Sequence, residues 1–510
     1  MKKILKILLH RLTFVIFLLM LQVLALVTMI LKFNNYFVYF YVFCLLLSLI
    51  VFLHIINNKS NPSYKIAWMV PILIFPIFGG LFYILFGGNK LSNHSRKKMD
   101  AIKQKMHSIN LDNIELEKIS KENIVAAKQA NYIQKNSRLP LCDNTYTEYY
   151  KIGEDMFERI KEELLKAKHY IFLEFFIIEE GIMWNSILDI LKQKVKEGVD
   201  VRLIYDDMGC IMTLPYKYSK KLEKEGIKTC IFNPFIPILS SRINNRDHRK
   251  IIVIDGYTGF TGGINLADEY INNYPKHGHW KDSGIMLKGE AVWNLTVMFL
   301  SMWDYIREID ENYQNYLPKI HLNEKVDSTG YVLPYNDSPL DDETVGENIY
   351  LNLINNANKY VYITTPYLII DNEMITALTL ASKSGVDVKI ITPGVPDKKI
   401  VNEVTKSYYQ VLIEGGVKIY EYTPGFVHAK NFIVDDEYST VGTINLDYRS
   451  LYLHFECGVW MYNTDSIKDV KKDFIETLEK CTEINLEICK NVSKPRRFLR
   501  AILKLFAPLL

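Results

Sequence analysis

The sequence predicts an α/β protein whose two similar halves pack about a pseudo-two-fold axis, preceded by transmembrane helices. Three observations indicate this: charge-free apolar runs near the N-terminus, an alternation of short β-branched or aromatic runs with amphipathic stretches, and four sequence blocks that recur later in the same order. The 510 residues suffice for several domains with a sizeable core. The predicted order is a membrane anchor over 1–90, a charged connector over 91–136, a first half over 137–325, a second half over 326–493 and a basic amphipathic tail over 494–510.

Three apolar runs make up the anchor, over residues 12–31, 36–56 and 66–86. At ~1.5 Å rise per residue, each is long enough to cross a hydrocarbon layer of ~30 Å. The first run is too long for the core of a signal peptide, and no small-residue cleavage site follows it. Two prolines and two glycines interrupt the third run, so it either spans with a kink or re-enters. We expect two to three spans in a multi-pass protein of the cell membrane.

Charge is distributed unevenly along the chain. The 61 Lys+Arg and 58 Asp+Glu separate into net charges of +11 over 1–99, −13 over 100–493 and +5 over 494–510. The negative middle argues against a nucleic-acid partner, whereas the cationic ends suit anionic membrane lipids. The basic cluster at 96–98 and the seven unpatterned cysteines favour a cytoplasmic catalytic domain. The cysteine spacing indicates neither a zinc site nor a disulfide framework.

The repeated blocks indicate a gene duplication. Residues 167–177 match 357–367, 198–204 match 385–391, 226–228 match 416–418, and 248–255 match 428–435. This period is too long for a solenoid. In the first half, strands are predicted over 170–177 and 201–205 and helices over 184–196 and 216–225. Each half should therefore build a mixed, mainly parallel sheet.

The fourth block carries residues suited to phosphoryl chemistry. His248 and Lys250 alternate on a predicted strand, so their side chains share one face, and Asp255 follows in the turn that ends the strand. Asn265 lies in the glycine-rich return. The second copy repeats the set as His428, Lys430, Asp435 and Asn445. If the copies meet at the seam between halves, lysine and asparagine can bind phosphoryl oxygens, one histidine can attack phosphorus and the other can protonate the leaving oxygen.

Both copies resemble the motif of the phospholipase D superfamily, H-x-K-x4-D-x6-G-[GS]-x-N, and depart from it only at Thr443. Within that superfamily the chain is similar to bacterial cardiolipin synthases, on the apolar N-terminal runs and on the residues around both motifs. The segments that carry this resemblance are 245–250, 262–270, 365–367, 445–450 and the tail from 498.

The resemblance implies a phosphatidyl transfer in two steps without a metal or cofactor. One histidine attacks phosphatidylglycerol and releases glycerol, and a second phosphatidylglycerol then takes the phosphatidyl group to give cardiolipin. It further implies that His248 is the nucleophile, that His428 is the acid and base, and that Asp282 and Glu456 orient the two rings. Asp255 and Asp435 belong to the catalytic motif, although their place in the turn indicates a structural role.

Several points stay open at this stage. Arg246, Arg249 and Arg449 could contact phosphate or form structural ion pairs, and His454 has no matched partner, so we treat it as a bystander. The tail is either an interfacial amphipathic helix or a docked core helix. Alternative functions are a phospholipase D-type hydrolase, another phosphatidyltransferase, or an inactive lipid-binding scaffold. The sequence leaves the acceptor alcohol and the oligomeric state undetermined.

Overall fold

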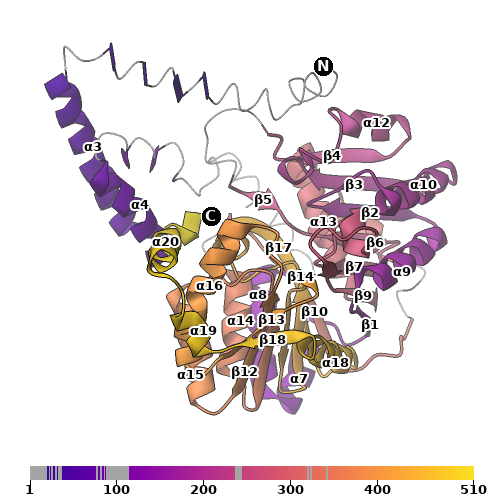
Figure 1. Cartoon of the computed structure of the whole chain (residues 1–510). Helices are drawn as coiled ribbons and strands as arrows, with labels where there is room; N and C mark the ends of the chain where they lie inside the picture. The colour runs from indigo at the N-terminus through magenta and orange to yellow at the C-terminus, as the bar shows by residue number, and fades with distance from the viewer. Residues whose placement is uncertain are drawn as a thin grey trace.

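The computed structural model describes residues 37–75, 114–235, 244–318, 324–340 and 343–509, together with His321 and scattered residues between 20 and 87. Most of the first apolar run, the end of the third and residues 91–113 of the connector lie outside the described residues. The two halves lie side by side, each built on a β-sheet covered by helices (Figure 1).

Within the described residues, the sheet of the first half has seven strands. In spatial order these are β1 (Thr145–Tyr150), β9 (Gly284–Gly289), β7 (Thr258–Gly262), β6 (Ile251–Ile254), β2 (Tyr170–Phe175), β3 (Asp200–Asp206) and β4 (Lys228–Phe232). Only β2–β3 and β3–β4 are parallel. The prediction of a mainly parallel sheet is therefore wrong. The three-residue turn that Asp255 begins joins β6 to β7, and so short a connection permits only an antiparallel pair.

Helices cover both faces of this sheet, so successive side chains of its strands enter two different cores. In β2, Ile171 and Leu173 pack under α9 (Gly153–Lys166) and α10 (Ile182–Lys196), while Phe172 faces α13 (Val292–Arg307). α13 is buried along most of its length and also contacts the second half. The remaining helices of this half are α11 (Asp207–Cys210), α12 (Tyr218–Lys224), η3 (Asp268–Ile271) and η4 (Tyr313–Tyr316).

The second sheet repeats the order and direction of the first seven strands, which confirms the duplication. Its strands are β10 (Tyr331–Asp337), β17 (His454–Tyr462), β16 (Tyr438–Gly442), β15 (Asn431–Val434), β11 (Tyr360–Thr364), β12 (Asp387–Pro393) and β13 (Lys418–Tyr422), with β18 (Cys481–Ile484) added at the edge. Its helices are α14 (Val345–Asn355), α15 (Asn372–Lys383), α16 (Lys399–Glu414), α17 (Tyr448–Tyr452), α18 (Ser466–Leu478) and α19 (Leu486–Lys490).

Two short strands cross from one half to the other. β5 (Arg246–Asp247) of the first half pairs in parallel with the start of β17, and β14 (Gly425–Val427) of the second half pairs in parallel with β8 (His279–Lys281). β5 and β14 each come directly before a His-x-Lys block. The two crossings are therefore equivalent under the pseudo-two-fold relation between halves, and both motifs lie at the seam.

The described part of the connector is docked on the second half. α7 (Ile114–Glu122) and α8 (Ile124–Ser137) contact each other, and α8 packs against β10 and α14. The sequence shows no strong apolar stripe here, but Ile119, Ala126, Ala130 and Ile133 are buried. Small alanine side chains let the helices approach closely without a long hydrophobic run.

At the N-terminal end, α3 (Phe37–Asn57) is long and apolar enough to cross a membrane. Within the described residues, one helix meets this criterion. α4 (Pro62–Ile74) packs beside it through Tyr64, Trp68 and Ile72. α4 also contacts α20 (Lys494–Leu505) and η5 (Ala507–Leu509) at the C-terminus (Figure 1). The apolar helices thus join the body of the second half beside the tail.

Candidate active site

The two His-x-Lys blocks occupy the links between the crossing strands and the main sheets. His248 to Lys250 connect β5 to β6, and His428 to Lys430 connect β14 to β15, so neither block lies on one continuous strand as the sequence suggested. The backbone N–H of His248 donates to the carbonyl of Phe455 at 2.9 Å, and that of His428 donates to the carbonyl of Lys281 at 2.7 Å. Each histidine is therefore fixed by the backbone of the other half.

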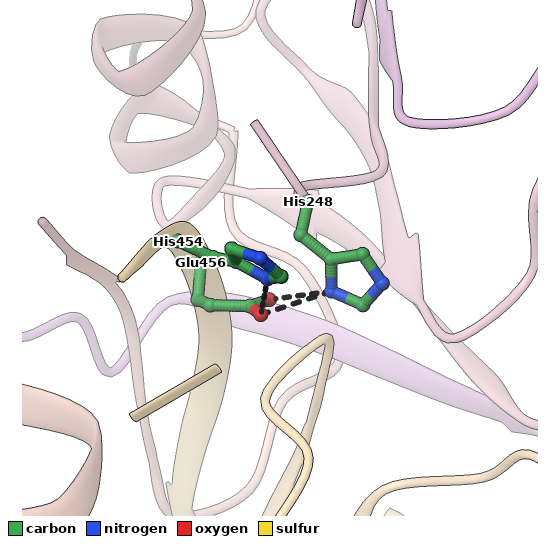
Figure 2. Close-up of side chains that lie close together, drawn as sticks. All are labelled: His248, His454 and Glu456. Carbon is green, nitrogen blue, oxygen red and sulfur yellow. Dashed lines mark hydrogen bonds and ion pairs between the residues drawn. The ribbon is translucent and has the colours of Figure 1, made fainter. Parts of the chain in front are cut away.

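Each imidazole also takes its carboxylate from the other half. His248 Nδ1 lies 2.9 and 3.0 Å from the two carboxylate oxygens of Glu456, and His428 Nδ1 lies 2.6 Å from Asp282 Oδ2. A carboxylate only accepts, so Nδ1 carries the proton in both rings and Nε2 keeps its lone pair. Figure 2 shows the second nitrogen of His248 directed away from Glu456. This is the orientation that leaves Nε2 available as a nucleophile or base.

Two buried lysines accompany the histidines. Lys250 and Lys430 are each 2% exposed, and each ammonium donates to the carbonyl of the histidine two residues earlier. Burial lowers the pKa of Lys250 to about 8 and that of Lys430 to about 7. Such lysines are poised to gain an anionic neighbour, because a bound phosphate would favour their charged form.

Burial lowers the pKa of both histidines as well, that of His428 to about 4 and that of His248 well below its usual value, and the site lysines act in the same direction. The four groups thus share one electrostatic environment. Burial opposes the charge of Asp282, but His428 and Lys430 outweigh it and hold the pKa of this carboxyl below its usual value.

The glycine-rich returns differ between the copies. A Cβ on Gly263 would lie 2.0 Å from Asp282 Oδ1, so glycine is required there for the acid to reach His428. At the equivalent position, the Thr443 hydroxyl donates to Glu456 Oε2. The departure of Thr443 from the motif therefore supplies a second partner for the acid that holds His248.

The two asparagines also differ. Asn265 accepts from the N–H of Ile177 at 3.0 Å and donates to the Tyr270 hydroxyl at 2.7 Å, which anchors Tyr270 beside His428. The Oδ1 atom of Asn445 is buried and has no hydrogen-bond partner among the described residues. A phosphate contact stays a prediction for both asparagines. The Oδ1 atom of Asn265 already has a partner, whereas that of Asn445 has none among the described residues.

Asp255 and Asp435 do not join the catalytic cluster, and placing them in the catalytic set is corrected here. Asp255 accepts three backbone N–H groups of residues 168–170, and Asp435 accepts three from residues 358–360. Both have positive φ, of 53° and 58°. Each carboxylate therefore fixes the start of the neighbouring strand, as its place in the turn indicated.

The structure decides between the two alternatives left open for Arg249 and differs from the expectation for His454. Arg249 is buried in ion pairs with Glu174 and Asp247 and is a structural residue. His454, treated as a bystander, has its ring centroid 5.6 Å from that of His248 and its Nδ1 3.6 Å from Glu456 Oε1. The signal that could have found it is the alternation in β17, which puts His454 and Glu456 on one face.

Comparison with known proteins gives the same family for both halves. The family model described as "Cardiolipin synthase, PLD-like domain" matches residues 160–303 and 350–478, which contain both His-x-Lys blocks and both orienting acids. The chain belongs to the cardiolipin synthase family. A second model, "Phospholipase_D-nuclease N-terminal", matches residues 46–88.

Relatives within the cardiolipin synthase family align over nearly the whole chain. A cardiolipin synthase of Halalkalibacterium halodurans is 35% identical over 90% of this chain and 92% of its own length. One from Geobacillus is 36% identical over 90% and 92%. A Streptococcus mutans protein described as uncharacterized is 47% identical over 90% and 99%. Among solved structures, phosphatidylserine synthase of Haemophilus influenzae is similar with a TM-score of 0.58 at 16% identity, covering 75% of this chain and all of that chain, which supports the fold.

Proposed function

We propose that this protein is a membrane-bound phosphatidyltransferase that joins two phosphatidylglycerol molecules into cardiolipin and glycerol. The observation that carries the proposal is the pair of imidazoles at the seam, each with Nδ1 held by a buried acid and with a buried lysine beside it. One ring can then act as nucleophile while the other transfers protons, which a covalent two-step transfer requires.

In the first step, His248 Nε2 attacks the phosphorus of one phosphatidylglycerol and a P–N bond forms. The P–O bond to the glycerol headgroup breaks, and His428 donates a proton to the leaving oxygen. Lys250 and Lys430 bind the non-bridging oxygens. The pKa of His428 is about 4 without ligand, and the negative phosphate raises it in the complex, so that the ring can carry this proton.

In the second step, the terminal hydroxyl of another phosphatidylglycerol attacks the phosphatidyl-histidine. His428, now neutral, removes the hydroxyl proton, a P–O bond forms and the P–N bond to His248 breaks. Throughout, Glu456 accepts a hydrogen bond from the Nδ1–H of His248 and so stabilises the positive ring of the intermediate. The enzyme returns to its starting state.

The surface of the helices at this end of the molecule supports the membrane location. α3 exposes a row of large apolar side chains, including Val38, Phe43 and Leu46. On α20, Arg496 and Arg500 pair with Glu403 of α16, while Phe498 and Leu499 are exposed. We infer that α3 spans the membrane and that α20 places this apolar edge on an anionic bilayer, with the catalytic body in the cytoplasm.

The test is to reconstitute the purified chain into vesicles with labelled phosphatidylglycerol and to separate the lipid products. We expect cardiolipin and free glycerol in equal amounts, and the same rate after treatment with EDTA. Phosphatidic acid as the only product would replace the proposal with a hydrolase. No turnover would favour a lipid-binding scaffold.

A further inference from the structure

His454 forms a three-residue cluster with His248 and Glu456 (Figure 2). The proposed transfer reaction gives roles to His248 and Glu456 but none to His454. One potential ligand atom from each residue lies within 4.8 Å of the others. Two imidazoles and one carboxylate are a ligand set that Zn²⁺ accepts in proteins. We propose that these three side chains form an inhibitory binding site for Zn²⁺.

The distances in the cluster fit a small tetrahedral ion. Zn²⁺ binds nitrogen and oxygen at ~2.0–2.1 Å, so neighbouring ligand atoms around it lie ~3.3 Å apart. Glu456 Oε1 is 2.9 Å from Nδ1 of His248 and 3.6 Å from Nδ1 of His454. The two contacts of Glu456 therefore change by less than half an ångström on coordination, while the ligand atoms of His248 and His454, now within 4.8 Å of each other, have to reach the same spacing. A fourth position is left for water.

His454 supplies the second, independent observation. Both of its ring nitrogens are buried and lack a hydrogen-bond partner within the described part of the chain, although buried imidazoles normally have one. Its side chain is 11% exposed and its Nδ1 lies nearest to Glu456. A metal ion would satisfy one of these nitrogens.

The other half of the seam provides an internal comparison. In the strand pairs, Phe455 lies opposite Asp247, the residue before His248. Lys281 lies opposite Val427, the residue before His428, so Phe455 and Lys281 are equivalent. The residue equivalent to His454 is therefore Trp280, which packs against the ring of His428 with centroids 5.5 Å apart. Trp280 offers no metal ligand, so the described residues of the seam form the proposed site around His248 and not around His428.

Zn²⁺ at this site blocks the reaction through the tautomer of His248, an effect that rests on the proposed function. Coordination uses the Nδ1 lone pair, so the proton that Nδ1 now donates to Glu456 has to leave. The neutral ring then carries its proton on Nε2, the atom that must attack phosphorus. The metal also takes Glu456 away from the ring that it orients.

The experiment measures zinc binding and phosphatidyl transfer on the same full-length protein in detergent. After EDTA treatment and dialysis, Zn²⁺ is added, and bound metal is determined by atomic absorption without lipid present. We expect the wild type to bind one ion per chain. His454→Asn should bind Zn²⁺ at least tenfold more weakly. The matched control is His169→Asn, at an exposed histidine outside the site, which should bind as the wild type does.

Transfer is then assayed with phosphatidylglycerol over the same range of Zn²⁺. We expect the rate to fall in proportion to occupancy, to return with EDTA, and to need at least tenfold more Zn²⁺ for the same fractional loss in His454→Asn. Equal binding by wild type and His454→Asn would overturn the site. Binding that needs His454 without any transfer activity would leave the site standing and remove the proposed function instead.

A spectroscopic readout covers the case in which His454→Asn does not fold. Co²⁺ in place of Zn²⁺ should give the visible absorption of a tetrahedral nitrogen and oxygen site in the wild type. His454→Gln, which keeps a polar side chain of similar length, should fold and lack this absorption. An unchanged Co²⁺ spectrum in His454→Gln would also overturn the proposal.

Discussion

At the scale of single residues, His248 and His428 have the same relation to their acids but different surroundings. His428 lies among the rings of Tyr270, Trp280 and Phe426, whereas His248 lies beside Phe176 and His454. Glu456 holds His248 through two oxygens, and Asp282 holds His428 through one. The copies are therefore not interchangeable, and different roles for the two histidines are chemically reasonable.

The first prediction separates these roles. His248→Ala should abolish the covalent phosphatidyl-enzyme, because no nucleophile remains. His428→Ala should still form it, but with formation and breakdown slowed by about 10²–10⁴-fold through loss of proton transfer. The measurement is the label that stays on the protein when it is denatured without acid after brief incubation with labelled phosphatidylglycerol. If His428→Ala loses the trapped species and His248→Ala keeps it, the roles are reversed.

The second prediction concerns pH. Burial lowers the pKa of Lys430 to about 7, so the ligand-free protein loses this cation as pH rises through neutrality. Because kcat/KM reports the free enzyme, it should fall on the alkaline side. His428, with a pKa of about 4, must take up a proton on binding substrate, so it adds a steady decline over this range and does not produce the inflection near pH 7.

Lys430→Arg tests this assignment, because arginine keeps its charge at every pH used. The alkaline limb of kcat/KM should move up by more than one pH unit, even if the rate at neutral pH is lower. An alkaline limb that stays where it is in Lys430→Arg would exclude Lys430 as the titrating group.

At the scale of elements, the apolar helices meet the catalytic body at the turn between α3 and α4. Asn61 caps α4 through the N–H of Ser63, and its Nδ2 donates to Asp371 and to the hydroxyl of Tyr452, each at 2.9 Å. The Tyr452 hydroxyl also contacts Glu347 at 2.8 Å. Burial raises the pKa of Glu347 to about 8. The joint is a partly buried polar network, in which loss of a donor leaves acceptors unpaired.

The third prediction follows from this joint. Asn61→Ala removes two donors and a helix cap and should lower stability by about 1–3 kcal/mol. The melting temperature in detergent measures the effect. Asn57→Ala is the matched control, since among the residues that the structure describes the Asn57 side chain bonds the carbonyl of Leu53 within its own helix and no other group. Equal melting temperatures for the two variants would contradict a supporting role for the joint.

The elements also show what sequence could predict and what it could not. The duplication and the two strands predicted in the first half follow from sequence patterns, and both are confirmed. The mainly parallel sheet was wrong because hairpins such as β6–β7 set strand direction, and a helix-and-strand alternation does not reveal them. Alternation in β17 places His454 on the same face as Glu456, but the position of His454 beside His248 depends on β5 pairing with β17, which no local pattern encodes.

At the scale of the whole molecule, the active site is assembled by exchange between halves. Glu456 of the second half serves His248, and Asp282 of the first half serves His428. α13, buried from Val292 to Asp304, contacts strands of both sheets and makes the interface part of one core. Catalysis therefore depends on the relative position of the halves to within a hydrogen-bond length.

The fourth prediction uses this exchange. Glu456→Gln should slow formation of the phosphatidyl-enzyme, and Asp282→Asn should slow its breakdown more than its formation, each by about 10²–10⁴-fold, as expected for loss of a histidine-orienting acid. Rapid-quench measurement of the burst and of steady turnover distinguishes the steps. Once trapping has identified His248 as the nucleophile, the pairing across halves would be contradicted if Asp282→Asn removed the burst and Glu456→Gln preserved it.

The strand crossings have a consequence for how such a chain could arise. A single half carries a histidine without its acid and a short strand without its partner, so it is complete only when a second copy binds it about a two-fold axis. Fusing the two copies replaces a concentration-dependent association with an intramolecular one, at effective concentrations in the millimolar range. The fusion also frees the copies to diverge, and the contrast between Trp280 and His454 is one product of that freedom.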